Sequence, residues 1–148
     1  MIQPVTWYLG GLLSNSNPTS TYYANERDSS KIYSGRSPST TGNVGLMYAS
    51  DYVYSVLSSS CDRTINLDSY NTNACAGNTW VKKEAYEWTI TPYSVFPSSV
   101  WYVVYTGSTN TNNSAYGGYA SRPVLYLKSD VKYISGTGTK SDPYIIDL

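Results

Sequence analysis

The sequence contains no histidine, only one phenylalanine and few charged residues. Histidine is the usual proton shuttle and a common metal ligand, so its absence excludes Ser-His and Cys-His catalytic arrangements and histidine metal sites. Charged side chains make up 14% of the 148 residues, and ten basic residues balance ten acidic ones. A neutral chain has no basic stripe, so we expect no nucleic-acid partner.

Long hydrophobic runs are also missing. The longest apolar stretch near the start, VTWYLGGLL at 5–13, is much shorter than the roughly 18 residues that a membrane span requires. We therefore expect no membrane insertion by this domain, and we identify no signal peptide. The length predicts one domain over residues 1–148. We interpret it as the C-terminal part of a longer exported chain.

What the chain has instead is tyrosine. Seventeen tyrosines and four tryptophans stand among many Ser, Thr and Asn residues. Tyr and Trp provide wide, rigid contact surfaces with a polar tip, and Ser and Asn add adaptable hydrogen bonds, as in binding loops. The alternative is that many of these residues only build strands, because β-sheets favour Tyr, Thr and Trp.

The two cysteines, Cys61 and Cys75, enclose the segment DRTINLDSYNTNA. Their spacing is too wide for a CxxC redox pair, and two thiols without histidine do not make an ordinary zinc site. We predict one disulfide, which stabilises the fold by about 3 kcal/mol in the chain-entropy model and implies a location outside the reducing cytosol. The alternative is a pair of buried free thiols.

The hydrophobic pattern predicts an α+β fold with mainly antiparallel sheets. Strands are expected in VTWYLG (5–10), VWYVVYTG (100–107) and RPVLYLKS (122–129), with a terminal hairpin formed by VKYI (131–134) and YIID (144–147). We expect one helix in SDYVYSVL, with Ser50 as N-cap and Asp51 in the first turn, and another around YYANERD. Two segments are loops by composition, SGRSPSTTG (34–42) and GSTNTNNSAYGGYAS (107–121).

Motifs spread over nearly the whole chain resemble a family of exported, surface-displayed or pilin-associated domains of Gram-positive bacteria. They occur in the order GLMYASDYVYS, the two cysteines, EWTITPYS, RPVLYLKS and GTGTKSDPY. The GLMYASDYVYS, EWT and RPV segments also follow the order found in the C-type-lectin-like fold, in the branch of the formylglycine-generating enzymes. This resemblance implies a C-type-lectin-like domain with small twisted sheets, one or two short helices, long loops and neighbouring termini.

The same resemblance implies that the first strand, VTWYLGG, pairs with a late strand such as RPVLYLKS. Four apolar residues are expected in the core: Trp7, Trp88, Leu125 and Leu127. We expect Glu87 to bond Arg122 or nearby backbone. A catalytic role for Glu87 would need a second positioned carboxylate or base, and the sequence shows no signature of one.

Catalytic and metal-binding motifs are absent from the sequence. The formylglycine-generating branch works through cysteines near the end of the domain, whereas both cysteines here precede EWT. The Glu-Pro-Asn and Trp-Asn-Asp motifs of calcium-dependent lectins do not occur. A structural calcium needs several converging oxygens, for which the candidates are Asp62, Asp68, Asn71 and Asn73; the alternative is a solvated polar loop. We expect a non-enzyme without cofactor or metal.

The predicted binding surface lies in a stretch that carries no charge from Ile90 to Ser121. Related C-type-lectin-like domains carry ligand contacts in this region. The candidate ligand-binding residues are Tyr93, Phe96, Trp101, Tyr105, Asn110, Asn112, Asn113, Tyr116 and Tyr119. For Trp101, burial in a central strand is an equal alternative. The tyrosines and the first two asparagines of this set are expected to share one exposed face.

Two functions follow from such a surface. The first is a non-catalytic extracellular recognition or adhesion module on a bacterial surface or pilus, which binds a protein or a glycan. A variant of it is a ligand-display protein diversified by a retroelement. The second is a structural pilus or filament subunit whose tyrosine-rich faces associate with copies of itself.

Overall fold

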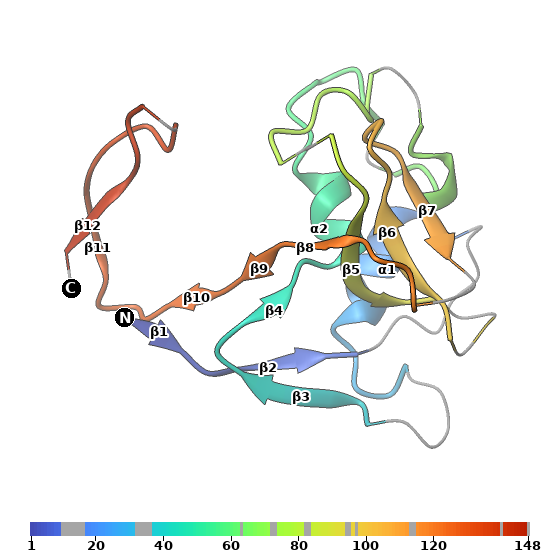
Figure 1. Ribbon diagram of the computed structural model, residues 1–148, viewed down its shortest axis with the longest axis horizontal. Helices are drawn as coiled ribbons and strands as arrows, with labels where there is room; N and C mark the ends of the chain where they lie inside the picture. The colour runs from blue at the N-terminus through green and yellow to red at the C-terminus, as the bar shows by residue number, and fades with distance from the viewer. Residues whose placement is uncertain are drawn as a thin grey trace.

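The chain folds as an α+β domain of short, mainly antiparallel sheets and two short α-helices, so the predicted class is confirmed (Figure 1). The computed structural model describes residues 1–9, 17–31, 37–62, 64–71, 74–81, 84–93, 96, 98–112, 115–139 and 141–147. A four-stranded sheet backed by the helices forms one part, and an arm of two-stranded sheets extends from it.

The four-stranded sheet has the order β7-β6-β5-β8. Its strands are β5 (Glu87–Pro92), β6 (Val100–Val103), β7 (Thr109–Asn112) and β8 (Ala120–Ser121). β5, β6 and β7 are antiparallel neighbours, and β8 runs parallel to β5. The prediction that residues 107–121 form only a loop is therefore wrong. Its threonines favour an extended backbone, and β7 pairs with β6 in register, with Asn110 opposite Tyr102.

Both expected helices are present, as α1 (Thr19–Glu26) and α2 (Ala49–Tyr54), and a 3-10 turn, η1 (Leu67–Ser69), follows. The helices lie behind the four-stranded sheet in Figure 1. Asp51 stands in the first turn of α2 as predicted, but the N-cap position is Tyr48 and not Ser50. The reason is that the Ser50 hydroxyl is bonded to the buried carboxyl of Glu26.

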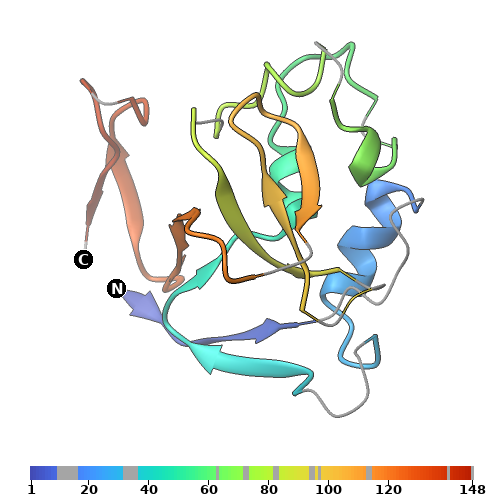
Figure 2. The ribbon, with the colours of Figure 1, turned by 45° about the vertical axis from the view of Figure 1, so that its right-hand side comes forward.

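The arm is built from four strand pairs. They are β1 (Ile2–Gln3) with β10 (Tyr126–Leu127), β2 (Val5–Tyr8) with β3 (Ser39–Gly42), β4 (Gly45–Leu46) with β9 (Pro123–Val124), and β11 (Lys132–Ser135) with β12 (Ile145–Asp147). The β11–β12 pair is the predicted terminal hairpin. It stands away from the four-stranded sheet in both views, near the two chain ends (Figure 2).

The first strand does not pair as expected. Ile2–Gln3 makes the contact with the late strand, whereas VTWY pairs with β3, which lies in a segment predicted to be a loop. Trp7 explains this choice, because its indole Nε1 donates to Gly42 O at 3.0 Å. A Cβ at Gly45 would lie 2.6 Å from the Trp7 ring, so only glycine lets the indole pack against this backbone.

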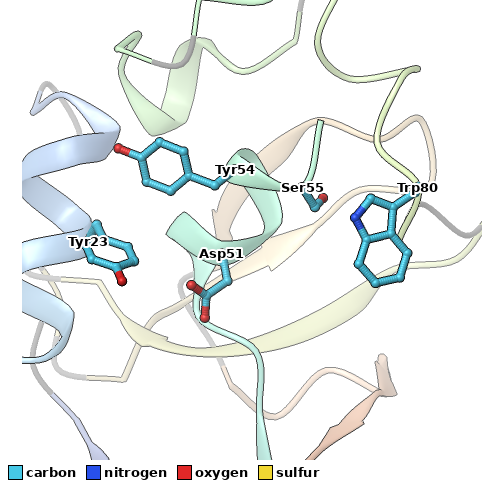
Figure 3. A pocket seen from close by; sticks show the side chains of 5 residues that line it. All are labelled: Tyr23, Asp51, Tyr54, Ser55 and Trp80. Atoms are coloured by element: carbon cyan, nitrogen blue, oxygen red, sulfur yellow. The ribbon is translucent and has the colours of Figure 1, made fainter. Parts of the chain in front are cut away.

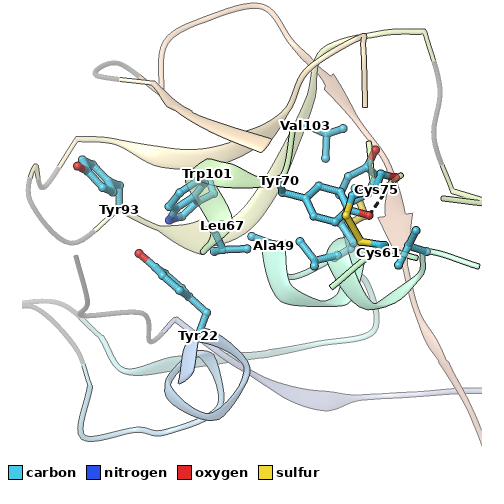
Figure 4. Packing of buried hydrophobic residues seen from close by; sticks show 13 residues of the cluster. Tyr22, Ala49, Cys61, Leu67, Tyr70, Cys75, Tyr93, Trp101 and Val103 are labelled. Carbon is cyan, nitrogen blue, oxygen red and sulfur yellow. Dashed lines mark hydrogen bonds between the residues drawn. A yellow bond between two sulfur atoms is a disulfide. The ribbon is translucent and has the colours of Figure 1, made fainter. Parts of the chain in front are cut away.

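The core lies between the helices and the four-stranded sheet, and its aromatic residues come from both layers (Figure 4). Tyr22 of α1 meets Trp101 of β6 edge to face, with ring centroids 5.6 Å apart. Trp7 is buried, as predicted. Leu125 and Leu127 are exposed, so their predicted burial is wrong. Leu125 lies between β9 and β10 and Leu127 lies in β10, so both belong to the arm, where the helices do not cover them.

The predicted disulfide is present between Cys61 and Cys75. Both cysteines belong to the core cluster. The Tyr70 hydroxyl donates to the Cys75 carbonyl at 3.4 Å (Figure 4). The cross-link thus closes a loop that packs against the interior instead of standing free in solvent.

Replacing Cys61 and Cys75 together by serine should lower the free energy of unfolding by about 2–4 kcal/mol, because the unfolded chain regains the entropy of the closed loop. Denaturant unfolding of both proteins measures this difference. Alkylation of the native protein without reductant should leave its intact mass unchanged, and two modified thiols would contradict the disulfide.

Glu26 is fully buried where α1, α2 and β5 meet. Its Oε1 accepts hydrogen bonds from the Ser50 backbone N–H at 3.3 Å and from the Thr91 hydroxyl at 2.5 Å. Its Oε2 bonds the Ser50 hydroxyl. Arg27 Nη1 lies 3.5 Å from Glu26 Oε2. One carboxyl therefore ties the two helices to the central strand.

Burial raises the pKa of Glu26 from 4.5 to about 7, because desolvation outweighs the hydrogen bonds and the Arg27 charge. Below pH 4.5 the carboxyl is protonated in both the folded and the unfolded states. Between pH 4.5 and 7 the unfolded chain loses this proton first. The free energy of unfolding therefore falls as the pH rises through this window, by about 3 kcal/mol in total.

The substitution Glu26→Gln should remove this decrease. Its amide oxygen can accept from Ser50 and Thr91, and its amide nitrogen can donate to the Ser50 hydroxyl, as the protonated acid does. Urea unfolding from pH 4 to pH 8 measures the effect, and Glu84→Gln, at an exposed position, is the matched control. A variant that keeps the wild-type decrease would show that Glu26 is not its source.

Candidate ligand-binding surface

Strand β5 faces its polar side inward and its apolar side outward. Glu87, Thr89 and Thr91 are buried, whereas Trp88 and Ile90 are only half-buried on the other face. Strands alternate their side chains between two faces, and the apolar face usually packs on the core. The core prediction for Trp88 is therefore correct only in part, because its indole packs on the outer face of the sheet.

Each inward polar side chain of β5 has a hydrogen-bond partner, so the reversed orientation leaves none of these side chains buried without one. The Thr89 hydroxyl donates to Trp101 O at 2.7 Å. Thr91 bonds Glu26 and accepts from the Ala49 N–H at 2.9 Å. Glu87 bonds Arg122, as predicted.

Glu87 and Arg122 form a largely buried ion pair. Arg122 Nη2 donates to the two carboxylate oxygens of Glu87 at 2.9 and 2.7 Å. Both carboxylate oxygens of Glu87 thus accept from one guanidinium nitrogen. This ion pair holds the segment after β8 against β5.

The outer face of the sheet carries a cluster of five rings that we call the aromatic platform. Its members are Tyr86, Trp88, Tyr102, Tyr105 and Tyr119. Tyr119 lies at the centre, with ring centroids 4.4 Å from Trp88, 5.0 Å from Tyr86 and 5.0 Å from Tyr102. Tyr86 and Tyr105 form the more exposed end, with centroids 5.4 Å apart.

The platform is uncharged. Partial burial raises the pKa of Tyr102, and the neighbouring Tyr119 and Tyr86 raise it further. Its hydroxyl therefore stays protonated at neutral pH and acts as a hydrogen-bonding group. Such a surface offers ring faces and neutral polar tips to a ligand, but no nucleophile or general base.

An apolar pocket of about 450 Å³ adjoins the platform. Its lining residues are Val44, Gly45, Leu46, Ile90, Ser121 and Pro123. Ile90 follows Trp88 on the same face of β5, and Ser121 pairs with Trp88 across β5 and β8. The platform and the pocket are thus neighbouring parts of one outer surface.

The structure brings part of the predicted set to this surface. Tyr105 and Tyr119 belong to the platform, and exposed Asn110 lies opposite Tyr102. Tyr116 is 92% exposed on the connection between β7 and β8. Asn112 ends β7 opposite Val100. The Asn112 side chain, and Asn113 as a whole, lie outside the described residues.

Two residues of the predicted set lie on the opposite side of the sheet. Trp101 is 0% exposed and Tyr93 is 7% exposed, and their rings pack edge to face at 6.0 Å. Both therefore belong to the core, and the prediction that Tyr93 shares the exposed face is wrong. The Tyr93 N–H donates to Ser99 O at 2.9 Å, which holds it beside β6. Exposed Phe96 contacts Tyr93 with centroids 6.2 Å apart.

Sequence reasoning missed Tyr86 and Tyr102 and assigned Trp88 to the core. A signal was present in the alternation of EWTITP and VWYV. Once Trp101 and Val103 are placed inward, Tyr102 must point outward, and the register with β5 then puts Trp88 beside it. Choosing which face is inward required knowledge of the buried Glu26.

Among the calcium ligands considered in the disulfide loop, Asp62 is engaged within its own turn. It accepts from the Thr64 N–H and hydroxyl at 2.8 and 2.6 Å, and these bonds lower its pKa. Asn73 lies outside the described residues. Over the part of the chain that the structure describes, no three Cys, Asp or Glu side chains converge as metal ligands.

Comparisons with known proteins give no relative. No model of a known protein family matches the chain, and searches of curated proteins and of solved structures find no significant match. Within the described residues, no helix has the length and apolar character needed to cross a membrane. Functional inference therefore depends on the surface itself.

Proposed function

We propose that the protein is a non-catalytic extracellular recognition module that binds a protein or a glycan through the aromatic platform. The observation that carries this proposal is the orientation of β5 and β6. Trp88, Ile90 and Tyr102 point away from the core, while three polar residues of β5 occupy the inner face. An exposed patch of large apolar side chains typically marks an interaction site.

The chemistry of the platform suits a neutral ligand. Tyrosine and tryptophan are the residues that contribute most often to binding hot spots, and their rings lose little conformational entropy on binding. No charged residue occurs from Ile90 to Ser121. Binding should therefore depend little on salt concentration, and ring stacking and hydroxyl hydrogen bonds would supply the affinity.

The C-type-lectin-like fold and the bacterial-surface location are part of this proposal. They are supported by the order of the GLMYASDYVYS, EWT and RPV motifs, by neighbouring chain ends (Figure 1) and by the disulfide, which suits an oxidising environment. The retroelement-diversified variant rests on the same platform and predicts that its residues differ among otherwise similar proteins.

Truncating the exposed end of the platform should weaken ligand binding. We expect the double substitution Tyr86→Ala and Tyr105→Ala to weaken binding at least tenfold, because aromatic anchors typically contribute about 2 kcal/mol or more. Tyr105 is 51% exposed, so the melting temperature should change little. A glycan and protein array identifies ligands, and titration of the strongest hit gives the affinity.

The matched control is Tyr133→Ala, an exposed tyrosine on the terminal hairpin. It should leave array binding unchanged. Retention of full affinity in the platform variant, together with a loss in the hairpin control, would place recognition on the arm and overturn the proposal.

A second function, self-association as a filament subunit, is favoured by the terminal hairpin. Tyr133 and Ile134 are both exposed although they face opposite sides of β11, and Tyr144 and Ile145 are exposed on the partner segment. One side holds a pocket of about 430 Å³. A two-stranded hairpin is marginally stable alone and leaves strand edges open, so a second copy of the chain would cover it.

Analytical ultracentrifugation over a wide concentration range tests this second function. If copies associate through the hairpin, the mass should rise with concentration, and Tyr133→Thr with Ile134→Thr should keep the protein monomeric. A mass that stays monomeric in the wild type would exclude the filament function for this domain. The platform variant serves as the control that should associate like the wild type.

A further inference from the structure

A third pocket, on the helical side of the molecule, has a composition different from that of the platform. It measures about 510 Å³ and is lined by Tyr23, Asp51, Tyr54, Ser55 and Trp80. In Figure 3 the Asp51 side chain lies between the Tyr23 ring and the Trp80 indole, and the indole nitrogen faces the interior of the group. Three rings, a carboxylate and a hydroxyl thus meet in a space of the size that small ligands occupy.

Trp80 is held at the pocket even though it is 71% exposed. The preceding residue, Thr79, is buried and forms an isolated β-bridge with Val56 at the end of α2. The Thr79 hydroxyl also bonds the hydroxyl of Ser55. The turn that carries Trp80 is therefore anchored to the end of α2 at Thr79, and the indole lines the pocket.

The pocket is electrically balanced. Arg27 Nη2 donates to Asp51 Oδ1 at 2.6 Å, which compensates the only carboxylate in the lining. The guanidinium also lies over the Tyr23 ring at 3.9 Å and the Tyr48 ring at 4.4 Å. An ammonium ligand is attracted by aromatic ring faces and by negative charge. Arg27 already covers the Tyr23 ring and compensates the Asp51 carboxylate, which leaves the exposed Trp80 indole as the open ring of the pocket.

Hydrogen-bonding capacity remains on the carboxylate. No hydrogen bond among the described residues uses Asp51 Oδ2. The side chain is 40% exposed, so this oxygen is open to a ligand hydroxyl. An exposed indole face beside a charge-compensated carboxylate matches a pyranose ring, which presents an apolar C–H face and a rim of hydroxyls.

We propose that this pocket binds one sugar unit of a neutral glycan, with the pyranose stacked on Trp80 and a hydroxyl donating to Asp51 Oδ2. Tyr23 and Tyr54 line the same space. The site shares no residue with the aromatic platform, so this proposal does not depend on the function proposed for that surface.

The test uses the intact protein and four named probes. Triacetylchitotriose, maltotriose and lactose represent neutral glycans, and choline represents a cationic ligand. Saturation-transfer difference NMR detects contact, and quenching of tryptophan fluorescence gives the affinity. At least one glycan should bind saturably at millimolar or lower concentration, with no loss of affinity when salt is raised, and choline should not bind.

Variants place the binding in the pocket. Trp80→Ala should weaken glycan binding at least tenfold, whereas Trp80→Phe should retain part of it because a ring face remains. Leu57→Ala changes a neighbouring exposed apolar residue that does not line the pocket and should have no effect. Tyr133→Ala, an exposed tyrosine outside both the pocket and the platform, should also leave this binding unchanged.

Three results would overturn the sugar site. One is the absence of saturable binding for all three glycans. Another is glycan binding that survives Trp80→Ala or is lost in Leu57→Ala. The third is choline binding that weakens with salt and disappears in Asp51→Asn, which would identify a cation site instead.

Discussion

The buried carboxyl of Glu26 is the interaction on which the rest of the structure depends. It sits at the junction of α1, α2 and β5 and bonds Ser50 and Thr91 at once. A carboxyl in such a place must find polar partners, because an unpartnered buried group is costly. Thr91 has to face inward to reach it. Since strand residues alternate between two faces, Ile90 and Trp88 must then face outward. The inward orientation of the polar residues of β5 thus follows from the position of the buried Glu26 carboxyl.

Both candidate binding surfaces depend on this junction. On the sheet side, the outward turn of Trp88 allows Tyr119 and Tyr102 to gather around it. On the helical side, Arg27 follows Glu26 in sequence and reaches Asp51 of the neighbouring helix. That ion pair fixes α1 beside α2 and neutralises the pocket in front of Trp80.

Local patterns in the sequence were sufficient for several elements. The strand around VWYV, both helices, the terminal hairpin, the disulfide and the Glu87–Arg122 pair all appear as predicted. Periodicity alone did not determine which face of β5 points inward, because the core commonly takes the apolar face and here takes the polar one. The same limit applies to Tyr93 and Leu127, whose burial depends on which layer their strand joins. Residues 39–42 pair with the strand of Trp7, whose indole donates to Gly42 O and packs against Gly45, a long-range contact that the local pattern does not show.

The central claim is that the sheet turns Trp88 and Tyr102 toward solvent and Trp101 toward the core. Hydroxyl-radical footprinting of the native protein, read residue by residue by mass spectrometry, measures this directly. The account predicts that Trp88 and Tyr102 are oxidised faster than Trp101 and Tyr22, with Tyr105 faster still. Oxidation of Trp101 ahead of Trp88 would contradict it, because the outer face of the sheet would then be the one described here as the interior.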